Sequence, residues 1–151
     1  MKLLVFGLEE ALEYEPVDET YAIRIASSWV SIRDFGRLRS SPLYVVKEYV
    51  FDDVKPGFGK GKDDILIGED IARRVLEDFK TEGLTRETLL VHCIGGRNRS
   101  PAVALALGEI FRLGYDTEEL RRKYPLLVLN QHICRTLKET AAKLGISAPT
   151  S

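Results

Sequence analysis

A cysteine and an arginine lie close together near the middle of the chain, at a spacing that suits phosphate chemistry. Residues 92–100 read HCIGGRNRS, so five residues separate Cys93 from Arg99, and Ser100 follows the arginine. A thiolate is a strong nucleophile at neutral pH. A guanidinium holds two oxygens of one phosphate in a bidentate fork, which a lysine cannot do. The pair therefore predicts a phosphoryl-transfer site with Cys93 as nucleophile and Arg99 as phosphate ligand.

The residues around this pair predict a loop that binds an anion through its backbone. Residues 89–92 form a short apolar run typical of a buried strand, and a helix is expected from about residue 100 to 113. A strand-to-helix loop turns successive N–H groups inward, and the helix N-terminus adds positive potential, which favours the thiolate of Cys93 over the thiol. The two glycines permit close approach of the backbone. The expected phosphate-binding residues are Ile94, Gly95, Gly96, Arg97, Asn98 and Arg99.

The other elements predict an α/β fold that places this loop at the end of a central strand. Strands are expected at residues 3–6, 21–25, 43–51 and 89–92. One helix is expected around the apolar face formed by Ile67, Ile71, Val75 and Phe79, and it should end at Gly83. Further helices are expected at residues 100–113, 116–123 and 131–144, the last with Asn130 as N-cap. Helix-separated strands favour a central, mainly parallel sheet flanked by helices, with ligands at the carboxyl ends of the strands. The length of 151 residues suits a single domain over residues 1–151.

Composition and charge exclude several other classes of protein. Hydrophobic residues make up 44% and charged residues 30%, as in ordinary globular proteins and unlike disordered or fibrous chains. A net charge of −1 gives no reason to expect nucleic acid or an anionic membrane as partner. The apolar run at the N-terminus ends at Glu9, too early for a signal peptide or a membrane span, so a cytoplasmic location is expected. The oligomeric state is left open.

The cysteine count argues against structural uses of sulfur. The two cysteines, Cys93 and Cys134, show no CxxC spacing, so neither a disulfide framework nor a cysteine zinc site is indicated. No cofactor and no metal are expected. Cys134 stands beside Ile133 in a helical apolar pattern, which favours a core position, although a redox role stays open.

The segment HCxxGxxRS resembles the phosphate-binding loop of the protein tyrosine phosphatase superfamily, most closely that of its small dual-specificity members. More loosely, the resemblance extends from about residue 21 to 144 and implies the cysteine-phosphatase fold. It implies that Cys93 attacks phosphorus to form a phosphocysteine and that Arg99 binds the phosphate and the transition state. It also implies that Ser100 helps the thiolate to leave and that His92 tunes the cysteine from behind, although a histidine at a strand end is often a satisfied core residue.

The resemblance also indicates where the general acid should lie. A phosphate monoester needs a proton on its leaving oxygen, and the superfamily places its acid after a strand, ahead of the helix that precedes the nucleophile strand. Residues 51–53 read FDD at that place, and Asp53 is the predicted acid because the second carboxylate of such a pair is used. Asp53 precedes Cys93 by 40 positions, a long interval, so Asp52, Asp63 and Asp64 stay open. A capping role for the pair at a strand end is the alternative.

The substrate and some features of the loop rim stay open. A phosphorylated protein or a small phosphomonoester is expected, and phosphoinositides and RNA 5′-phosphates are alternatives. A catalytically inactive phosphate-binding module is a further alternative, although such modules commonly lose the cysteine or the arginine. Arg97 is expected at the rim of the loop. The stretch Pro56–Lys62 is either a mobile lid whose lysines steer an anionic substrate or a solvated surface loop.

Overall fold

A parallel sheet lies at the centre of the computed structural model, which describes residues 1–53, 64–125 and 130–146. Within those residues the strands are β1 (Lys2–Phe6), β2 (Thr20–Ala26), β3 (Tyr44–Val50) and β4 (Thr88–His92), in the spatial order β1-β4-β2-β3. All neighbouring pairs run parallel. The predicted α/β class, with a central sheet flanked by helices, is therefore confirmed, and the described sheet is entirely parallel.

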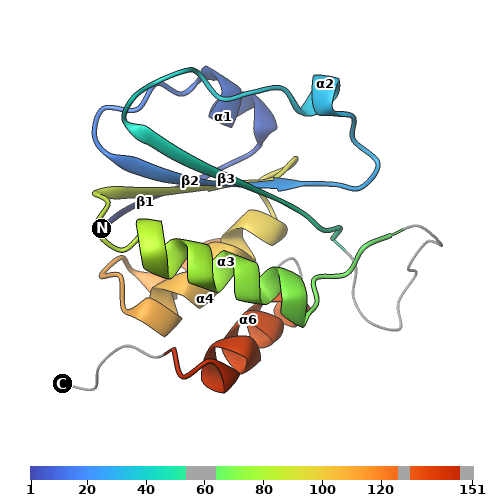
Figure 1. The fold of residues 1–151 in the computed structure, drawn as a ribbon, viewed down its shortest axis with the longest axis vertical. Helices are drawn as coiled ribbons and strands as arrows, with labels where there is room; N and C mark the ends of the chain where they lie inside the picture. Colours follow the sequence, from blue (N-terminus) through green and yellow to red (C-terminus); the bar gives the residue numbers. More distant parts are fainter. Residues whose placement is uncertain (54–63, 126–129, 147–151) are drawn as a thin grey trace.

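Helices cover the two faces of this sheet unequally, as Figure 1 shows. The long helices α3 (Glu69–Glu82), α4 (Arg99–Phe111) and α6 (Gln131–Lys143) lie on one face, and the short helices α1 (Leu8–Glu13) and α2 (Ile32–Phe35) lie on the other. Helix α5 (Thr117–Lys123) contacts α4. Among the described residues, no helix combines the length and the apolar character that crossing a bilayer requires.

The hydrophobic core lies between the sheet and the three long helices. Side chains alternate between the two faces of a strand, so Tyr21, Ile23 and Ile25 of β2 all enter this layer. On α3 the ring of Phe79 lies 5.3 Å from that of Tyr21 and 5.1 Å from that of Phe111, measured between centroids. The predicted apolar face of this helix is confirmed for Val75 and Phe79, which are buried. The contacts of this face hold α3 against the sheet.

The element boundaries agree with the local signals in most places. Asn130 is the N-cap of α6, where its side chain accepts a hydrogen bond from the N–H of Ile133 at 3.3 Å. Gly83 ends α3 as predicted. Ile67 is buried but precedes α3, which begins only after the N-cap Gly68, so its assignment to the helix was wrong. The helices α1 and α2 were not predicted, because six and four residues are too few to show a helical period.

We predict that Phe79→Ala lowers the free energy of unfolding by about 3–5 kcal/mol, because it removes a ring that is fully buried in the core. The neighbouring Lys80 is exposed on the same helix, and Lys80→Ala should change this free energy by less than about 0.5 kcal/mol. Chemical denaturation measures both values. Equal effects of the two substitutions would contradict the packing of α3 described above.

Candidate active site

The segment that carries the predicted nucleophile connects the end of β4 to the start of α4. Cys93 follows His92, the last residue of β4, and α4 begins at Arg99. Since β4 lies between β1 and β2, this loop sits at the carboxyl ends of parallel strands, as predicted. The backbone between β1 and α1 braces it from one side, where the N–H of Leu8 donates to the carbonyl of Ile94 at 2.9 Å.

The sulfur of Cys93, the predicted nucleophile, has hydrogen-bond partners from its own loop and from the helix that follows. Cys93 is buried, and its Sγ accepts a hydrogen bond from the N–H of Gly96 at 3.1 Å. The Oγ of Ser100, in the first turn of α4, lies 3.2 Å from the same sulfur. The sulfur therefore has a backbone N–H and a hydroxyl within hydrogen-bond distance.

The predicted phosphate ligand connects the loop to the segment that carries the candidate acids. Arg99 is buried, and its Nη1 donates to the carbonyl oxygen of Phe51 at 2.8 Å. Phe51 directly precedes Asp52 and Asp53. The structure thus brings Arg99 and both acids of the FDD segment to the same end of the sheet, although more than 40 positions separate them in the chain.

The first acid of this segment is a structural anchor. The Asp52 side chain accepts hydrogen bonds from the N–H of Ser28 at 2.9 Å, from the Ser28 hydroxyl at 2.6 Å and from the N–H of Ile65 at 2.8 Å. Burial alone raises the pKa of the Asp52 carboxyl, but these hydrogen bonds and the charge of Arg99 outweigh it and hold the pKa below its usual value. A carboxylate held ionised in this way is poorly suited to deliver a proton.

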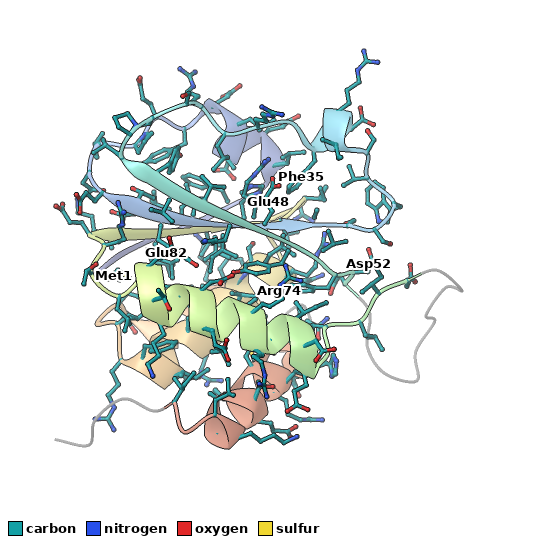
Figure 2. The ribbon with its side chains drawn as sticks, viewed as in Figure 1. Met1, Phe35, Glu48, Asp52, Arg74 and Glu82 are labelled. Carbon is teal, nitrogen blue, oxygen red and sulfur yellow. The ribbon has the colours of Figure 1, made fainter. Side chains whose placement is uncertain are left out.

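The second acid lies at the rim of the nucleophile loop. Asp53 is exposed, and its Oδ2 accepts a hydrogen bond from the side-chain amide of Asn98, a loop residue. Its Oδ1 accepts another from Nδ2 of the buried Asn130 at 3.0 Å. Figure 2 shows the neighbouring Asp52 just beyond the end of β3. Of the other candidates, Asp64 is half-buried, and Asp63 lies outside the described residues, as does the stretch Pro56–Lys62.

The histidine before the nucleophile is buried beneath the loop. Its Nε2 accepts a hydrogen bond from Nε of Arg24 at 2.8 Å, and its Nδ1 lies 3.2 Å from the carbonyl oxygen of Cys93. Burial lowers the pKa of His92 to about 4, since the hydrogen bond to Cys93 only partly opposes it and the charge of Arg24 adds to it. The ring is therefore neutral near pH 7, and it touches the nucleophile only through its backbone.

Sequence reasoning missed two residues that contact these groups. Arg24 lies in the strand expected at residues 21–25 but was assigned no role, and Asn130 was predicted only as a helix cap. A charged residue among the apolar positions of TYAIRIA was the one signal for the first. Nothing local indicated that Asn130 also donates to Asp53, because 77 positions separate the two residues in the chain.

The remaining predicted loop residues differ in exposure, and the second cysteine lies elsewhere. Arg97 and Gly95 are exposed, Ile94 is half-buried, and Gly96 is buried with φ of +71°. Cys134 on α6 donates from Sγ to the carbonyl of Ala102 at 3.4 Å. Burial raises the pKa of the Cys134 thiol to about 11, so this sulfur stays protonated at neutral pH. Over residues 1–53, 64–125 and 130–146, no group of three or more His, Cys, Asp or Glu side chains is placed to hold a metal ion.

Comparisons with known proteins add little to this description. No protein-family model matches the chain. No curated protein matches it either. Among solved structures, the chain is similar to one described as the crystal structure of Tk-PTP in the active form, with 20% identity, a TM-score of 0.46, and coverage of 93% of this chain and 90% of that chain. A likeness at this level assigns neither a family nor an activity to the chain.

We predict that Gly96→Ala disrupts the loop, because φ of +71° suits glycine and because the added Cβ would lie 2.6 Å from the backbone nitrogen of Gly7. The free energy of unfolding should fall by about 2 kcal/mol or more. Gly95 is the matched control, since a Cβ there meets no atom within 4 Å, and Gly95→Ala should cost less than about 0.5 kcal/mol. If urea denaturation found the two variants equally stable, the described loop conformation would be wrong.

Proposed function

We propose that the chain is a cysteine-dependent phosphomonoester hydrolase of the protein tyrosine or dual-specificity phosphatase type, acting through a phosphocysteine intermediate. One observation carries the proposal: the buried Sγ of Cys93 accepts a hydrogen bond from a backbone N–H of a strand-to-helix loop, beside a serine hydroxyl. The buried Arg99 begins the helix that follows. A nucleophilic sulfur, a loop of backbone donors and a fixed guanidinium are the parts that phosphoryl transfer through sulfur requires.

In the proposed complex, the phosphate of the substrate binds over the sulfur. Its non-bridging oxygens accept hydrogen bonds from the backbone of residues 94–99, and the N-terminus of α4 adds positive potential. Arg99 contributes a charged donor whose position the carbonyl of Phe51 maintains at 2.8 Å. Negative charge that develops on these oxygens in the transition state is thereby stabilised by groups already in place.

The first proposed step transfers the phosphoryl group to sulfur. The Cys93 thiolate attacks phosphorus, so that the S–P bond forms while the bond from phosphorus to the leaving oxygen breaks. Asp53, protonated in this step, gives its proton to that oxygen, which departs as an alcohol or phenol. The amide of Asn130, which donates to Oδ1 of Asp53 at 3.0 Å, supports the orientation of the carboxyl group.

The second proposed step hydrolyses the phosphocysteine. A water molecule attacks phosphorus and gives a proton to the Asp53 carboxylate, while the S–P bond breaks and the electron pair returns to sulfur. The hydroxyl of Ser100, 3.2 Å from the sulfur, stabilises the departing thiolate by donating a hydrogen bond to it. Inorganic phosphate leaves, and the thiolate and the protonated acid are restored for the next cycle.

We predict that Cys93→Ser abolishes turnover of p-nitrophenyl phosphate while phosphate binding persists, because serine is far too weak a nucleophile without a base beside it. Cys134→Ser makes the same atomic change at the cysteine remote from the loop and should retain wild-type turnover. Release of p-nitrophenol and calorimetric titration with phosphate measure the two properties. Activity in Cys93→Ser would refute the mechanism, whereas a wild-type protein that binds phosphate but turns over no phosphomonoester would be an inactive binding module.

For the acid, we predict that Asp53→Asn lowers kcat by roughly 10²-fold or more for phenyl phosphate but much less for p-nitrophenyl phosphate, because only the poorer leaving group needs the proton. The rate of the wild type plotted against pH should be bell-shaped, and its falling limb, where the general acid loses its proton, should vanish in this variant. Asp64→Asn and Asp63→Asn should leave that limb in place. If instead the limb survives in Asp53→Asn and disappears in one of these two, the acid is that residue.

A further inference from the structure

A row of polar side chains crosses three neighbouring strands directly beneath the nucleophile loop. The strand registers place Arg24 of β2 opposite His92 of β4 on one side and opposite Glu48 of β3 on the other. Side chains opposite one another across parallel strands point to the same face of a sheet. The row lies on the face that carries α1 and α2, and Figure 2 shows Glu48 and Phe35 together on that side. The row runs from His92, the residue before Cys93, to Glu48 on the edge strand β3.

Hydrogen bonds link the members of this row without a gap. Nε of Arg24 donates to Nε2 of His92 at 2.8 Å, and Nη1 donates to Oε1 of Glu48 at 2.7 Å. Two further bonds at 2.9 Å hold the same guanidinium, from Nη1 to the carbonyl of Gly36 and from Nη2 to that of Phe35. The Phe35 ring covers the group from 4.1 Å and lies 5.4 Å from the His92 ring, measured between centroids. The arginine is thus fixed in position and orientation.

This arrangement determines which nitrogen of the histidine carries the proton. An arginine N–H donates and never accepts, so Nε2 of His92 must be the unprotonated nitrogen. In a neutral imidazole the proton then resides on Nδ1, and its neighbour at 3.2 Å is the carbonyl oxygen of Cys93. His92 therefore donates to the backbone of the nucleophile as a consequence of its contact with Arg24.

Burial of a charge at this position is costly for stability alone. Arg24 is 2% exposed, while the side chain of its ion-pair partner Glu48 is 54% exposed and shares its charge with solvent. A buried ion pair often contributes no more to stability than apolar residues of similar volume. The neighbour two residues earlier on the same face is Ala22, so an apolar side chain is compatible with this layer. A role in the site accounts for the charge better than packing does.

We infer that Arg24 is a positioning residue for the nucleophile: it holds His92 as the Nδ1–H tautomer, and His92 in turn holds the carbonyl of Cys93, the first peptide of the loop. The orientation of that peptide sets where the N–H groups of the loop and the sulfur point relative to one another. Glu48 anchors the far end of the row. The inference rests on the proposed function for its catalytic meaning, but the tautomer of His92 is a property of the protein by itself.

The first experiment measures that tautomer directly. In ¹⁵N-labelled wild-type protein at pH 7, NMR of the imidazole nitrogens should show His92 with a protonated Nδ1 and an unprotonated Nε2. In Arg24→Met, which has no donor, the signals should move toward a mixture of both tautomers. Arg74→Met is the matched control, because Arg74 lies over the Tyr49 ring at 5.5 Å on α3, on the other face of the sheet. This control should leave His92 unchanged.

The second experiment measures the reactivity of the Cys93 thiol as a function of pH, and it does not require turnover. The rate of Cys93 alkylation by iodoacetamide, followed against pH, reports the thiolate. The charged and titratable groups around the loop are Arg99 from α4, Asp53 from the segment after β3 and His92 from β4, with Arg24 behind the histidine. The Ser100 hydroxyl, 3.2 Å from the sulfur, is uncharged. In Arg24→Met the pH at which the alkylation rate reaches half of its maximum should rise by about one unit. At any pH below this midpoint, that shift is a tenfold loss of thiolate. The rising limb of the kcat/KM profile should move by the same amount, whereas a general loss of structure would lower its height without moving it.

A second variant covers the case in which Arg24→Met does not fold. Arg24→Lys keeps the charge but replaces the planar fork by a single ammonium group, which cannot serve His92, Glu48 and two carbonyls together. It should shift the alkylation midpoint in the same direction by a smaller amount. Unchanged tautomer signals and an unchanged midpoint in a folded Arg24 variant would overturn the inference. Turnover by Cys93→Ser would instead overturn the proposed function and leave the tautomer result intact.

Discussion

The shape of the nucleophile loop depends on one close contact, where Gly96 turns against the end of β1. Its backbone is in the left-handed region, and a side chain there would overlap the backbone of Phe6 and Gly7. The N–H that this turn directs inward is the one that reaches the sulfur of Cys93 at 3.1 Å. The parallel pairing of β1 with β4 is therefore a condition for the site, because it places the backbone of Phe6 and Gly7 against Gly96 of the loop.

The two adjacent acids Asp52 and Asp53 make different contacts, although they are neighbours in one extended segment. Successive side chains of an extended chain point in opposite directions, so Asp52 turns inward and Asp53 turns outward. The inward carboxylate joins the segment to Ser28 and Ile65. The outward one reaches the loop through Asn98. Because Arg99 also donates to the carbonyl of Phe51, the segment that carries the two acids and the loop after β4 are held together by hydrogen bonds of the protein itself.

Local signals made much of this arrangement predictable. The HCxxGxxRS segment spans nine residues, and the buried strand before it and the helix after it have clear patterns, so the strand-to-helix loop between Cys93 and Arg99 and the α/β order followed from the sequence. The contacts that cross the fold did not follow. Nothing near Arg24 in the chain indicates that it meets His92, 68 positions away, and nothing near Asn130 indicates Asp53. Such pairs depend on strand order and register, which local periodicity does not encode.

The register of the strands therefore determines which polar side chains meet, as well as which apolar side chains pack in the core. A slip of β2 by one residue would turn Arg24 to the opposite face of the sheet, against Val75, Phe79 and the other core side chains of the helices, and would turn Tyr21 and Ile23 out of the core. The alternation that buries Ile23 and Ile25 on one face thus also presents Arg24 to His92 on the other. Since the core penalises such a slip strongly, the hydrophobic face of β2 secures the hydrogen bond beneath the nucleophile. The stability of the core and the tautomer of His92 are therefore consequences of the same pairing.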